Sequence, residues 1–518
     1  MLMVILAGAA VIDLTNLSTS LASFSSALTA GPSTLTAAKL STPTGLATAN
    51  GGCAGGSEKS NVSVTWTASA EHDADGNPLI GGYTVLRSTS SGGSYSSVGS
   101  TGVATSLTDV NPSGAEAPQV YVGNELLETV HAVNTSTNVG TSITTGTVGS
   151  EPNGVAVTPD GTKIVVAEGA SHQVQIITVS SHAVASTVTI PAVGGVKSRP
   201  DAVAVTPNGL TAYVVDGANK RVYPITVAGG ALGTAITVGN QGDPGAIVVT
   251  PNGEKAYVAN YSSHNVSVIS TSSNTVTATV TIGALETGKP IALAVTPDSA
   301  HVYVADQGNS KVNDIATASN TVTGTIAVGS MADANIAAGG DPNILAISPD
   351  GKKLYVASYA GGAVADIATA TDTVTSTIAL FESATANPNA LALTPNGCQL
   401  YVHDHAHNLV DAITVSSDAV SAHPAVAATG DPTGMSSAPD GAHVYVANAA
   451  AASVSVIATA TNTVSATWPE ATVGKAPHAV LATSSPYYYK LQASHGGWLS
   501  ALTASAAYSL GWNVGGWQ

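Results

Sequence analysis

The sequence predicts an all-β fold in which an eight-bladed β-propeller accompanies a smaller, discontinuous β-sandwich. Two observations lead to this prediction: a phrase that recurs through the middle of the chain, and strands that become complete only when the two ends are combined. Composition agrees with it. Only 9% of the 518 residues are charged and 53 are glycine, which favours β-structure with small packed side chains over long exposed helices.

The recurring phrase consists of a proline, a short apolar strand, a Thr-Pro-Asp/Asn-Gly turn and a second apolar strand. One copy begins at Pro200 with PDAVAVTPNG. Proline presets φ in such a turn, and glycine accepts positive φ. The turn prolines lie 44 to 52 residues apart, a period typical of four-stranded propeller blades. They are Pro159, Pro207, Pro251, Pro297, Pro349, Pro395 and Pro439.

The strand count predicts how the ring closes. Second strands occur eight times, and so do first strands if the segment after Pro477 is included. Residues 119–146 lack a first strand, whereas residues 477–483 form a first strand with nothing after it. We therefore expect these fragments to share one blade, with Ala479 beside Tyr121. Such a blade joins the ends of the ring and removes its exposed edges.

These repeats resemble the YVTN-type β-propeller repeat family. The segment YVANYSSHNVSVISTSSNTVTATVTIG at residues 257–283 carries the resemblance, which extends over roughly residues 118–483. The resemblance implies a ring of radial sheets and an extracellular or periplasmic setting. It implies no single chemistry, because propellers host many functions.

The sandwich is predicted from both ends of the chain. The segment WTASAEHDADGNPLIGGYTVLRSTSSGGSY, with Trp66 and Tyr83, resembles part of a fibronectin type III domain, and the Tyr-rich strand that this family would show next occurs only after Pro486. We expect a sandwich made of residues 43–114 and 485–508. The propeller, residues 115–484, would be inserted between them, with the sandwich on the face of the Thr-Pro turns.

The N-terminus predicts export. The apolar run MLMVILAGAAVI is too short to span a bilayer and matches the core of a signal peptide, which assigns residues 1–22 to a signal or hydrophobic segment. A buried core segment is the alternative. Residues 23–42 would be a linker or arm and residues 509–518 a tail. No later stretch is apolar for long enough to span a membrane.

Charge and cysteine content limit the partners and the chemistry. The formal net charge of −17 argues against nucleic acid as the main partner. Cys53 and Cys398 lie in different predicted domains, so we expect two free thiols. The expected location is extracellular or in the cell envelope.

Candidate binding residues lie in loops at the face opposite the Thr-Pro turns. We assign Asp216, Asp306, Asp341, Asp404 and Asp431 to this binding face. Three of them, Asp216, Asp306 and Asp404, occupy one repeat position. Polar side chains at such a position usually bond to the backbone of the adjoining turn, so a structural role is the competing interpretation.

Two motifs suggest metal ions. His403, His405 and His407 alternate, and on an extended strand three such imidazoles share one face and could bind a divalent metal. The run enters a loop, however, so solvated histidines are the alternative. Asp73, Asp75 and Asn77 resemble a calcium loop that lacks its downstream glutamate. No other cofactor is predicted.

The leading functional hypothesis is a secreted or cell-surface, non-enzymatic binding or scaffold protein. The loop face opposite the sandwich would recognise an extracellular protein, a carbohydrate or a surface polymer. The chain lacks the usual nucleophile, zinc-protease and phosphate-binding motifs, although a propeller enzyme of lactonase, lyase or cofactor-dependent dehydrogenase type is an alternative. A second alternative is a self-assembling subunit of an extracellular filament or surface layer, with residues 13–42 as its assembly arm.

Overall fold

The computed structural model describes residues 44–50, 62–67, 82–88, 96–101, 106–109, 119–124, 129–145, 152–240, 243–283, 287–329, 344–382, 385–426, 432–475, 477–483, 487–495, 498–499 and 506–508. The chain divides into two compact units. Strands β6 to β38 belong to the larger unit, and strands β1–β5 and β39–β41 belong to the smaller one.

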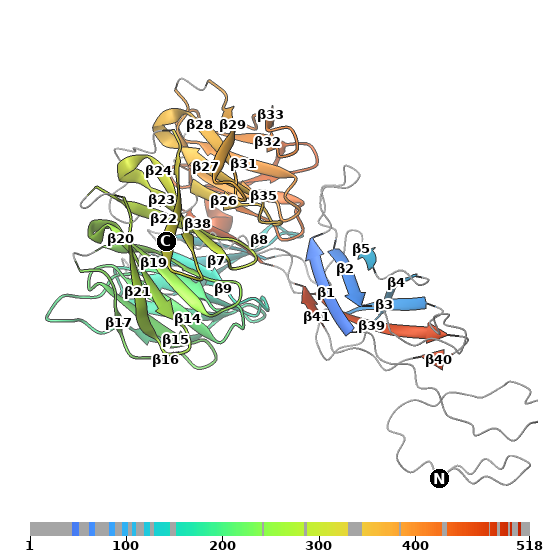
Figure 1. Ribbon diagram of the computed structural model, residues 1–518, viewed down its shortest axis with the longest axis horizontal. Helices are drawn as coiled ribbons and strands as arrows, with labels where there is room; N and C mark the ends of the chain where they lie inside the picture. The colour runs from blue at the N-terminus through green and yellow to red at the C-terminus, as the bar shows by residue number, and fades with distance from the viewer. Residues whose placement is uncertain are drawn as a thin grey trace, which may run out of the picture. The chain divides into compact units, whose positions relative to one another are not determined.

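The larger unit is an eight-bladed β-propeller, which confirms the propeller part of the predicted fold class (Figure 1). Each blade is a sheet whose strands follow chain order, apart from the blade that closes the ring. The first strands contact one another all the way round, from β9 through β13, β18, β22, β26, β30 and β34 to β38 and back to β9. They therefore form the innermost layer of the ring.

The strands of the first four complete blades are β9 (Pro152–Val157), β10 (Lys163–Glu168), β11 (Gln173–Thr178), β12 (Ala183–Thr189); β13 (Pro200–Val205), β14 (Thr211–Asp216), β15 (Arg221–Thr226), β16 (Ala231–Leu232), β17 (Ile236–Thr237); β18 (Pro244–Val249), β19 (Lys255–Asn260), β20 (Asn265–Ser270), β21 (Thr275–Thr281); and β22 (Pro290–Val295), β23 (His301–Asp306), β24 (Lys311–Ala316), β25 (Thr321–Ala327).

The next three blades contain β26 (Leu345–Ile347), β27 (Lys353–Ser358), β28 (Ala363–Ala368), β29 (Thr373–Ala379); β30 (Pro388–Leu393), β31 (Gln399–Asp404), β32 (Leu409–Thr414), β33 (Ala419–Ala422); and β34 (Pro432–Ser437), β35 (His443–Asn448), β36 (Ser453–Ala458), β37 (Thr463–Trp468). Short 3-10 turns follow β19, β23 and β27 at Tyr261–Ser263, Gln307–Asn309 and Tyr359–Gly361.

The closing blade is built from both ends of the propeller, as predicted. Its strand order is β38-β6-β7-β8, where β38 is Pro477–Thr483, β6 Gln119–Asn124, β7 Thr129–Asn134 and β8 Val139–Thr144. The expected register is wrong by two residues: Ala479 lies opposite Gly123, and Leu481 lies opposite Tyr121. A register shift after Pro477 accounts for part of this difference, because an irregular pairing displaces every later partner.

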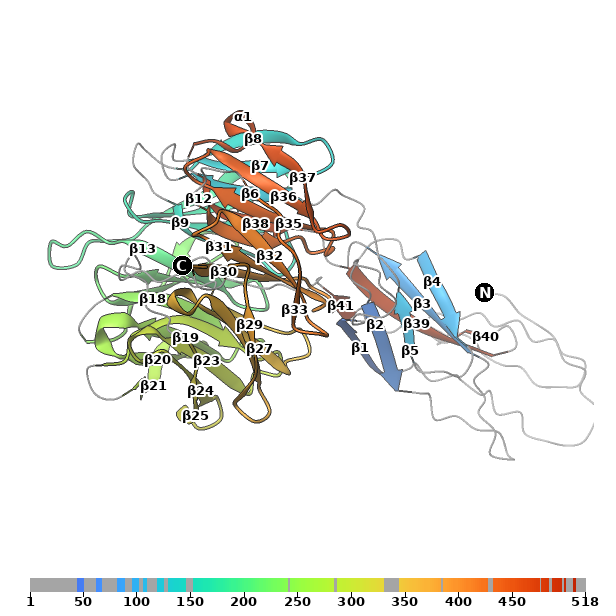
Figure 2. The ribbon, with the colours of Figure 1, turned by 90° about the horizontal axis from the view of Figure 1, so that it is seen from above.

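A short helix, α1 (Glu470–Val473), completes the closure. Figure 2 shows the cyan strands β7 and β8 near the orange strands β36 and β37, with α1 at the same place, and α1 contacts all four strands. The Trp468 indole stacks on Tyr445 and donates a hydrogen bond of 2.9 Å from Nε1 to Asn138 Oδ1. The blade of β34–β37 is thereby joined to the β7–β8 turn of the closing blade.

Turn chemistry explains the regularity of the blades. The glycine of the Thr-Pro-Asp/Asn-Gly turn is left-handed, as at Gly209 (φ 72°), and Ser299 takes the same conformation (φ 63°) in the one described copy without glycine. One blade departs from the pattern, because its outermost strand is divided into β16 and β17. Pro224 of the neighbouring β15 lacks a backbone N–H, and the division lies near it: Gly233 donates to the Pro224 carbonyl (2.7 Å).

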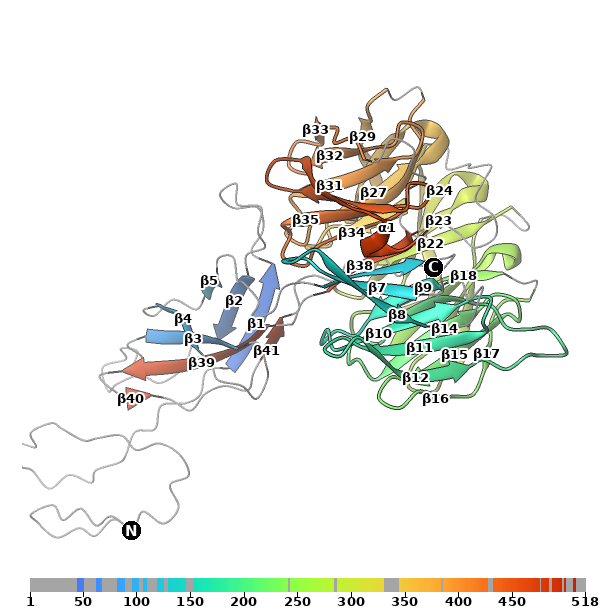
Figure 3. The ribbon, with the colours of Figure 1, turned by 180° about the vertical axis from the view of Figure 1, so that it is seen from behind.

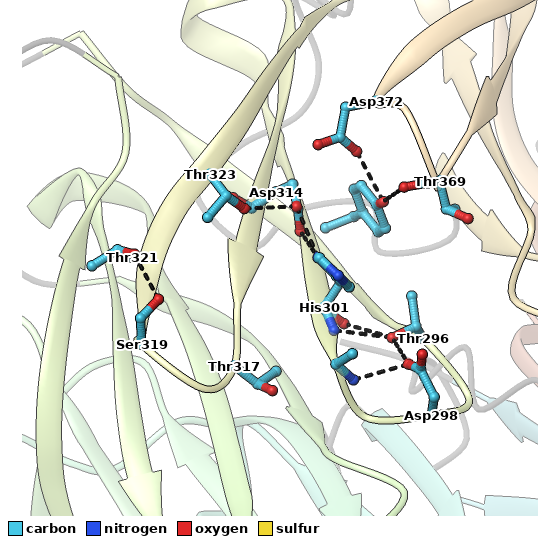
Figure 4. A network of polar contacts seen from close by, with 12 residues as sticks. Thr296, Asp298, His301, Asp314, Thr317, Ser319, Thr321, Thr323, Thr369 and Asp372 are labelled. Carbon is cyan, nitrogen blue, oxygen red and sulfur yellow. Dashed lines mark hydrogen bonds and ion pairs between the residues drawn. The ribbon is translucent and has the colours of Figure 1, made fainter.

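Buried tyrosines of the second strands connect neighbouring blades. Tyr213, Tyr257, Tyr303 and Tyr401 each donate their hydroxyl to a side chain in the third-to-fourth-strand turn of the next blade. Tyr303, for example, donates to Asp372 Oδ1 (3.0 Å) and to the Thr369 carbonyl (3.2 Å). Both acceptor residues are labelled in Figure 4. Beside Tyr303, the Asp314 carboxylate accepts hydrogen bonds from His301 and Thr323. The recurring tyrosine is thus a link between blades.

The smaller unit also combines both ends of the chain. One sheet contains β1 (Thr44–Asn50), β2 (Val62–Thr67) and β5 (Ser106–Asp109). The other has the order β4-β3-β39-β40, with β41 also paired to β39; these strands are β3 (Gly82–Ser88), β4 (Ser96–Thr101), β39 (Tyr487–His495), β40 (Trp498–Leu499) and β41 (Ala506–Tyr508). Figure 3 shows the red β39 beside the blue β3. In this pair of strands Tyr83 lies opposite Ala493. The fibronectin type III-like assignment stays a prediction.

The expectation of two free thiols is wrong, because Cys398 is disulfide-bonded. Cys53 is the only other cysteine of the chain and lies outside the described residues. No helix in the described part of the chain combines the length and apolar content needed to cross a bilayer.

Candidate functional site

The two ends of the propeller differ in what they display. At one end, which we call the turn end, lie the Thr-Pro turns and the third-to-fourth-strand turns. At the other, the loop end, second strands finish and first strands begin, as the pairing of Pro200 with Asp216 shows. The fourth-to-first and second-to-third connections meet there. Loops held on a rigid scaffold are the usual place for binding residues.

The repeated carboxylates of the loop end are buried, and each forms hydrogen bonds to two loops; we call these carboxylates clamps. Asp216, Asp306 and Asp404 have no exposed surface. Their Oδ1 atoms accept backbone N–H groups of the residues that precede the first strands, Arg199 (2.9 Å), Lys289 (2.8 Å) and Asn387 (2.9 Å). Each Oδ2 accepts a bond from the second-to-third-strand loop, namely Asn219, Asn309 and His407.

These clamps fix the loops that surround them and do not face solvent. The three aspartates therefore have the structural role that was the competing interpretation of their repeat position. Asp341 and Asp431, the other two residues assigned to the binding face, lie outside the described residues, as do Asp73, Asp75 and Asn77.

The three alternating histidines are separated by the end of β31. His403 is still on the strand, 1% exposed, with Nδ1 facing Asn389 Oδ1 at 2.5 Å. Burial lowers the pKa of His403 to about 3, so this ring is neutral. Its ring lies perpendicular to that of His405, with the centroids 6.4 Å apart.

His407 belongs to a different group of contacts. It bonds through Nδ1 to Asp404 Oδ2 (2.6 Å), and this bond raises the pKa of His407. Its Nε2 lies 3.1 Å from Glu382 Oε2. The structure therefore does not bring the three imidazoles of the predicted metal site to a common point. Within the described ranges, no group of three or more His, Cys, Asp or Glu side chains is arranged to hold a metal ion.

A polar cluster lies at the start of the innermost strands β9, β13 and β18. Arg199 Nε donates to both carboxylate oxygens of Asp201 (2.9 and 2.8 Å), and Asn153 donates to Asp201 Oδ1 (3.3 Å). Arg199 Nη2 lies 3.7 Å from Asp243 Oδ1. The Asp201 side chain is 10% exposed, whereas that of Arg199 is 44% exposed. The buried Asp201 carboxylate thus fixes the Arg199 guanidinium, while nearly half of the Arg199 side chain is exposed to solvent.

Burial raises the pKa of Asp201 to about 6, although Arg199 and Asn153 both favour its charged form. Gly217, directly after Asp216, has no side chain and so leaves room for the Asp201 carboxylate and the Arg199 guanidinium. A Cβ at Gly217 would lie 2.1 Å from Asp201 Oδ2 and 2.8 Å from Arg199 Nη2. An alanine at this position would therefore displace the Asp201 carboxylate and the Arg199 guanidinium.

The sequence analysis did not single out this cluster. The first strands were described as mostly apolar, although the residue after the opening proline is polar in several copies: Asn153, Asp201, Asn343, Asn389, Thr433 and His478. A polar residue at this one position of the repeat was the sequence feature that pointed to the cluster. The partnership of Asp201 with Arg199 and Asn153, which come from two blades, had no local signal.

One family model matches part of the chain. Its description is lactonase, 7-bladed beta-propeller, and it matches residues 271–386. The matched segment is less than a quarter of the 518 residues and does not include the Arg199–Asp201 cluster. The propeller has eight blades where that description has seven. No curated protein sequence matches the chain.

Several solved structures are similar in fold. The dihydro-heme d1 dehydrogenase NirN in complex with DHE matches with a TM-score of 0.54 and 11% identity, over 76% of this chain and 75% of that chain. Hydrazine synthase of Kuenenia stuttgartiensis matches with a TM-score of 0.47 and 21% identity, over 60% and 95%. The β-propeller domain of Cps50 (Swd1) of Myceliophteria thermophila has a TM-score of 0.45 and 10% identity, over 57% and 92%. At 11% identity, the similarity to the NirN structure concerns the fold alone.

Proposed function

We propose that this chain is an exported protein of the cell surface or extracellular space, and that its propeller is a non-enzymatic binding module with its recognition surface at the loop end. The smaller unit, as a fibronectin type III-like domain, would serve as a mount or spacer. Ligands are expected among extracellular proteins, carbohydrates and surface polymers.

Two features support export. The apolar segment within residues 1–22 matches a signal peptide core. The disulfide at Cys398 fits an oxidising compartment, because disulfides form and persist in secreted and envelope proteins and are rare in the cytosol.

The observation that carries the binding role is Arg199. Its Nε is engaged by the buried Asp201 carboxylate, which orients the guanidinium while nearly half of the side chain stays exposed. A guanidinium fixed in this way is a rigid fork of donors. It loses little conformational entropy when it binds carboxylate, hydroxyl or carbonyl groups of a ligand.

The test is binding of the fluorescently labelled full chain to intact cells of the source organism. We expect Arg199→Ala and Gly217→Ala to reduce binding at least tenfold, because the first removes the fork and the second displaces it. Lys352→Ala, on an 81% exposed side chain at the turn end, is the matched control and should bind like the wild type. Equal binding by all four proteins, or by none, would contradict the proposal.

A second candidate is an enzyme, and Asp201 is the observation that favours it. A buried carboxyl group whose pKa is raised to about 6 beside an exposed guanidinium is suited to general acid–base chemistry near neutral pH. Lactone hydrolysis is the first activity to assay, since the matching family model is described as lactonase. Turnover that Asp201→Asn abolishes without unfolding the protein would favour this candidate over a binding module.

A filament or surface-layer subunit remains the third hypothesis. Its proposed arm, residues 13–42, lies outside the described residues. Sedimentation of the full chain at increasing concentration, with and without that arm, tests it. Polymers that persist after the arm is removed would contradict the assembly role of this segment.

A further inference from the structure

An exposed aromatic residue lies at the loop end, in the connection between β29 and β30. Phe381 is 41% exposed and is the one aromatic member of the exposed large apolar side chains in the described part of the chain. Isolated exposed apolar residues are ordinary on protein surfaces. Phe381 differs because the residues around it hold it in place.

Two buried carboxylates organise the surroundings of Phe381. Asp411, on β32, accepts the Phe381 backbone N–H through Oδ2 (3.4 Å) and pairs with His423 Nδ1 through Oδ1. Asp404 pairs in the same way with His407. Both aspartates have no exposed side-chain surface. The two imidazoles are therefore oriented by buried partners.

The two oriented rings flank the phenyl group. The centroid of His423 lies 4.7 Å from that of Phe381, with the planes at 47°, and the centroid of His407 lies 6.4 Å away, nearly perpendicular at 81°. The backbone of Phe381 and both neighbouring rings are thus fixed. An aromatic side chain held in this way loses little entropy on binding, which is typical of binding hot spots.

The cluster carries an excess of negative charge. Glu382, whose side chain is 60% exposed, adds a third carboxylate next to Asp404 and Asp411, and its Oε2 lies 3.1 Å from His407 Nε2. Within the described residues, the ion pairs and ring contacts of this cluster involve two histidines and neither lysine nor arginine. Three carboxylates therefore face two imidazoles, beside an aromatic face that itself attracts cations.

We propose that Phe381 and Glu382 form a docking site for a lysine side chain of a partner protein. The methylene stem and the ammonium group lie over the face of the Phe381 ring, and the ammonium group pairs with Glu382. Lysine suits this site because it joins a long apolar stem to a compact charge. The net charge of −17 further favours a basic partner. This inference rests on the proposed function, since it assigns a partner to the loop end.

The probe is a fluorescein-labelled tetralysine peptide, titrated by anisotropy against the full chain at low salt. We expect Phe381→Ala to weaken binding at least fivefold and Glu382→Gln at least threefold. Phe381→Leu, which keeps an apolar surface but removes the ring, should also weaken it. The same peptide with acetylated lysines should not bind measurably, because acetylation removes the charge.

Two control variants make matching substitutions in exposed side chains at the turn end. Leu210→Ala removes a 61% exposed apolar side chain, and Glu254→Gln removes an exposed carboxylate, so both should bind tetralysine like the wild type. Wild-type affinity of Phe381→Ala, equal losses in the control variants, or equal binding of the acetylated peptide would overturn the inference. If tetralysine does not bind but Arg199-dependent cell-surface binding persists, only this inference fails; if both are absent, the proposed function fails too.

Discussion

Ring closure depends on Trp468, and truncating this residue tests how the two ends of the propeller are held. The indole is 3% exposed, stacks on Tyr445 at 5.3 Å and donates to Asn138 across the junction. Truncation of a buried tryptophan to alanine costs about 3–5 kcal/mol. At about 2.1 cal/mol/K of unfolding entropy per residue, that loss lowers the Tm of a propeller of this size by about 4–6 °C.

Thermal unfolding of Trp468→Ala followed by far-UV circular dichroism measures this loss. Hydrogen exchange then shows where it acts: amides of β6, β7 and β8 should exchange faster. Ile378→Ala, at the corresponding buried position of β29, should loosen its own blade and leave β6–β8 protected. Val139→Ala, 61% exposed on β8, should change stability by less than about 0.5 kcal/mol. An unchanged Tm, or faster exchange away from β6–β8, would refute the closure argument.

Three further predictions concern the clamps, the disulfide and the polar cluster. Asp216→Ala should destabilise the propeller by about 2–4 kcal/mol in denaturant unfolding, because it leaves the Arg199 N–H and the Asn219 amide without their acceptor, and Asp216→Asn should cost less. Intact-protein mass should rise by about two hydrogens on reduction, and the unreduced chain should accept no alkylating reagent at Cys398; labelling without reductant would contradict the disulfide. Asp201 has a folded-state pKa raised to about 6, so its ionisation penalises folding above that pH and the penalty vanishes below the ordinary carboxyl pKa. Asp201→Asn should therefore gain up to about 3 kcal/mol relative to the wild type between pH 4 and pH 7.5, whereas parallel stability curves would exclude the raised pKa.

Local repetition made the fold predictable. Each Thr-Pro-Asp/Asn-Gly turn specifies its own hairpin, since proline and the left-handed residue after it fix the backbone over four residues. Seven copies of this hairpin in sequence allow only a ring or an open stack of blades. The missing first strand at one end of the repeats and the extra first strand at the other end select a ring of eight blades. The same reasoning missed the register by two residues. The strand count does not specify how two strands pair, and the irregular pairing at Pro477 adds part of the difference.

The candidate sites were less predictable. The sequence placed Asp216, Asp306 and Asp404 correctly at one repeat position, but only the structure shows that their carboxylates point inward to backbone N–H groups. Alternation put His403 and His407 on one face of an extended strand. Because β31 ends at Asp404, the two side chains have different partners.

By itself, then, the sequence determined the number of blades, the turns that shape them and the two segments that meet to close the ring, because short-range backbone preferences repeat with a fixed period. Tertiary structure alone decided that Arg199 is held by Asp201, that Trp468 joins Asn138 and that Phe381 is flanked by two histidines. Each of these contacts joins residues from different strands or blades. Their distances depend on how the sheets pack, and no spacing along the chain specifies that.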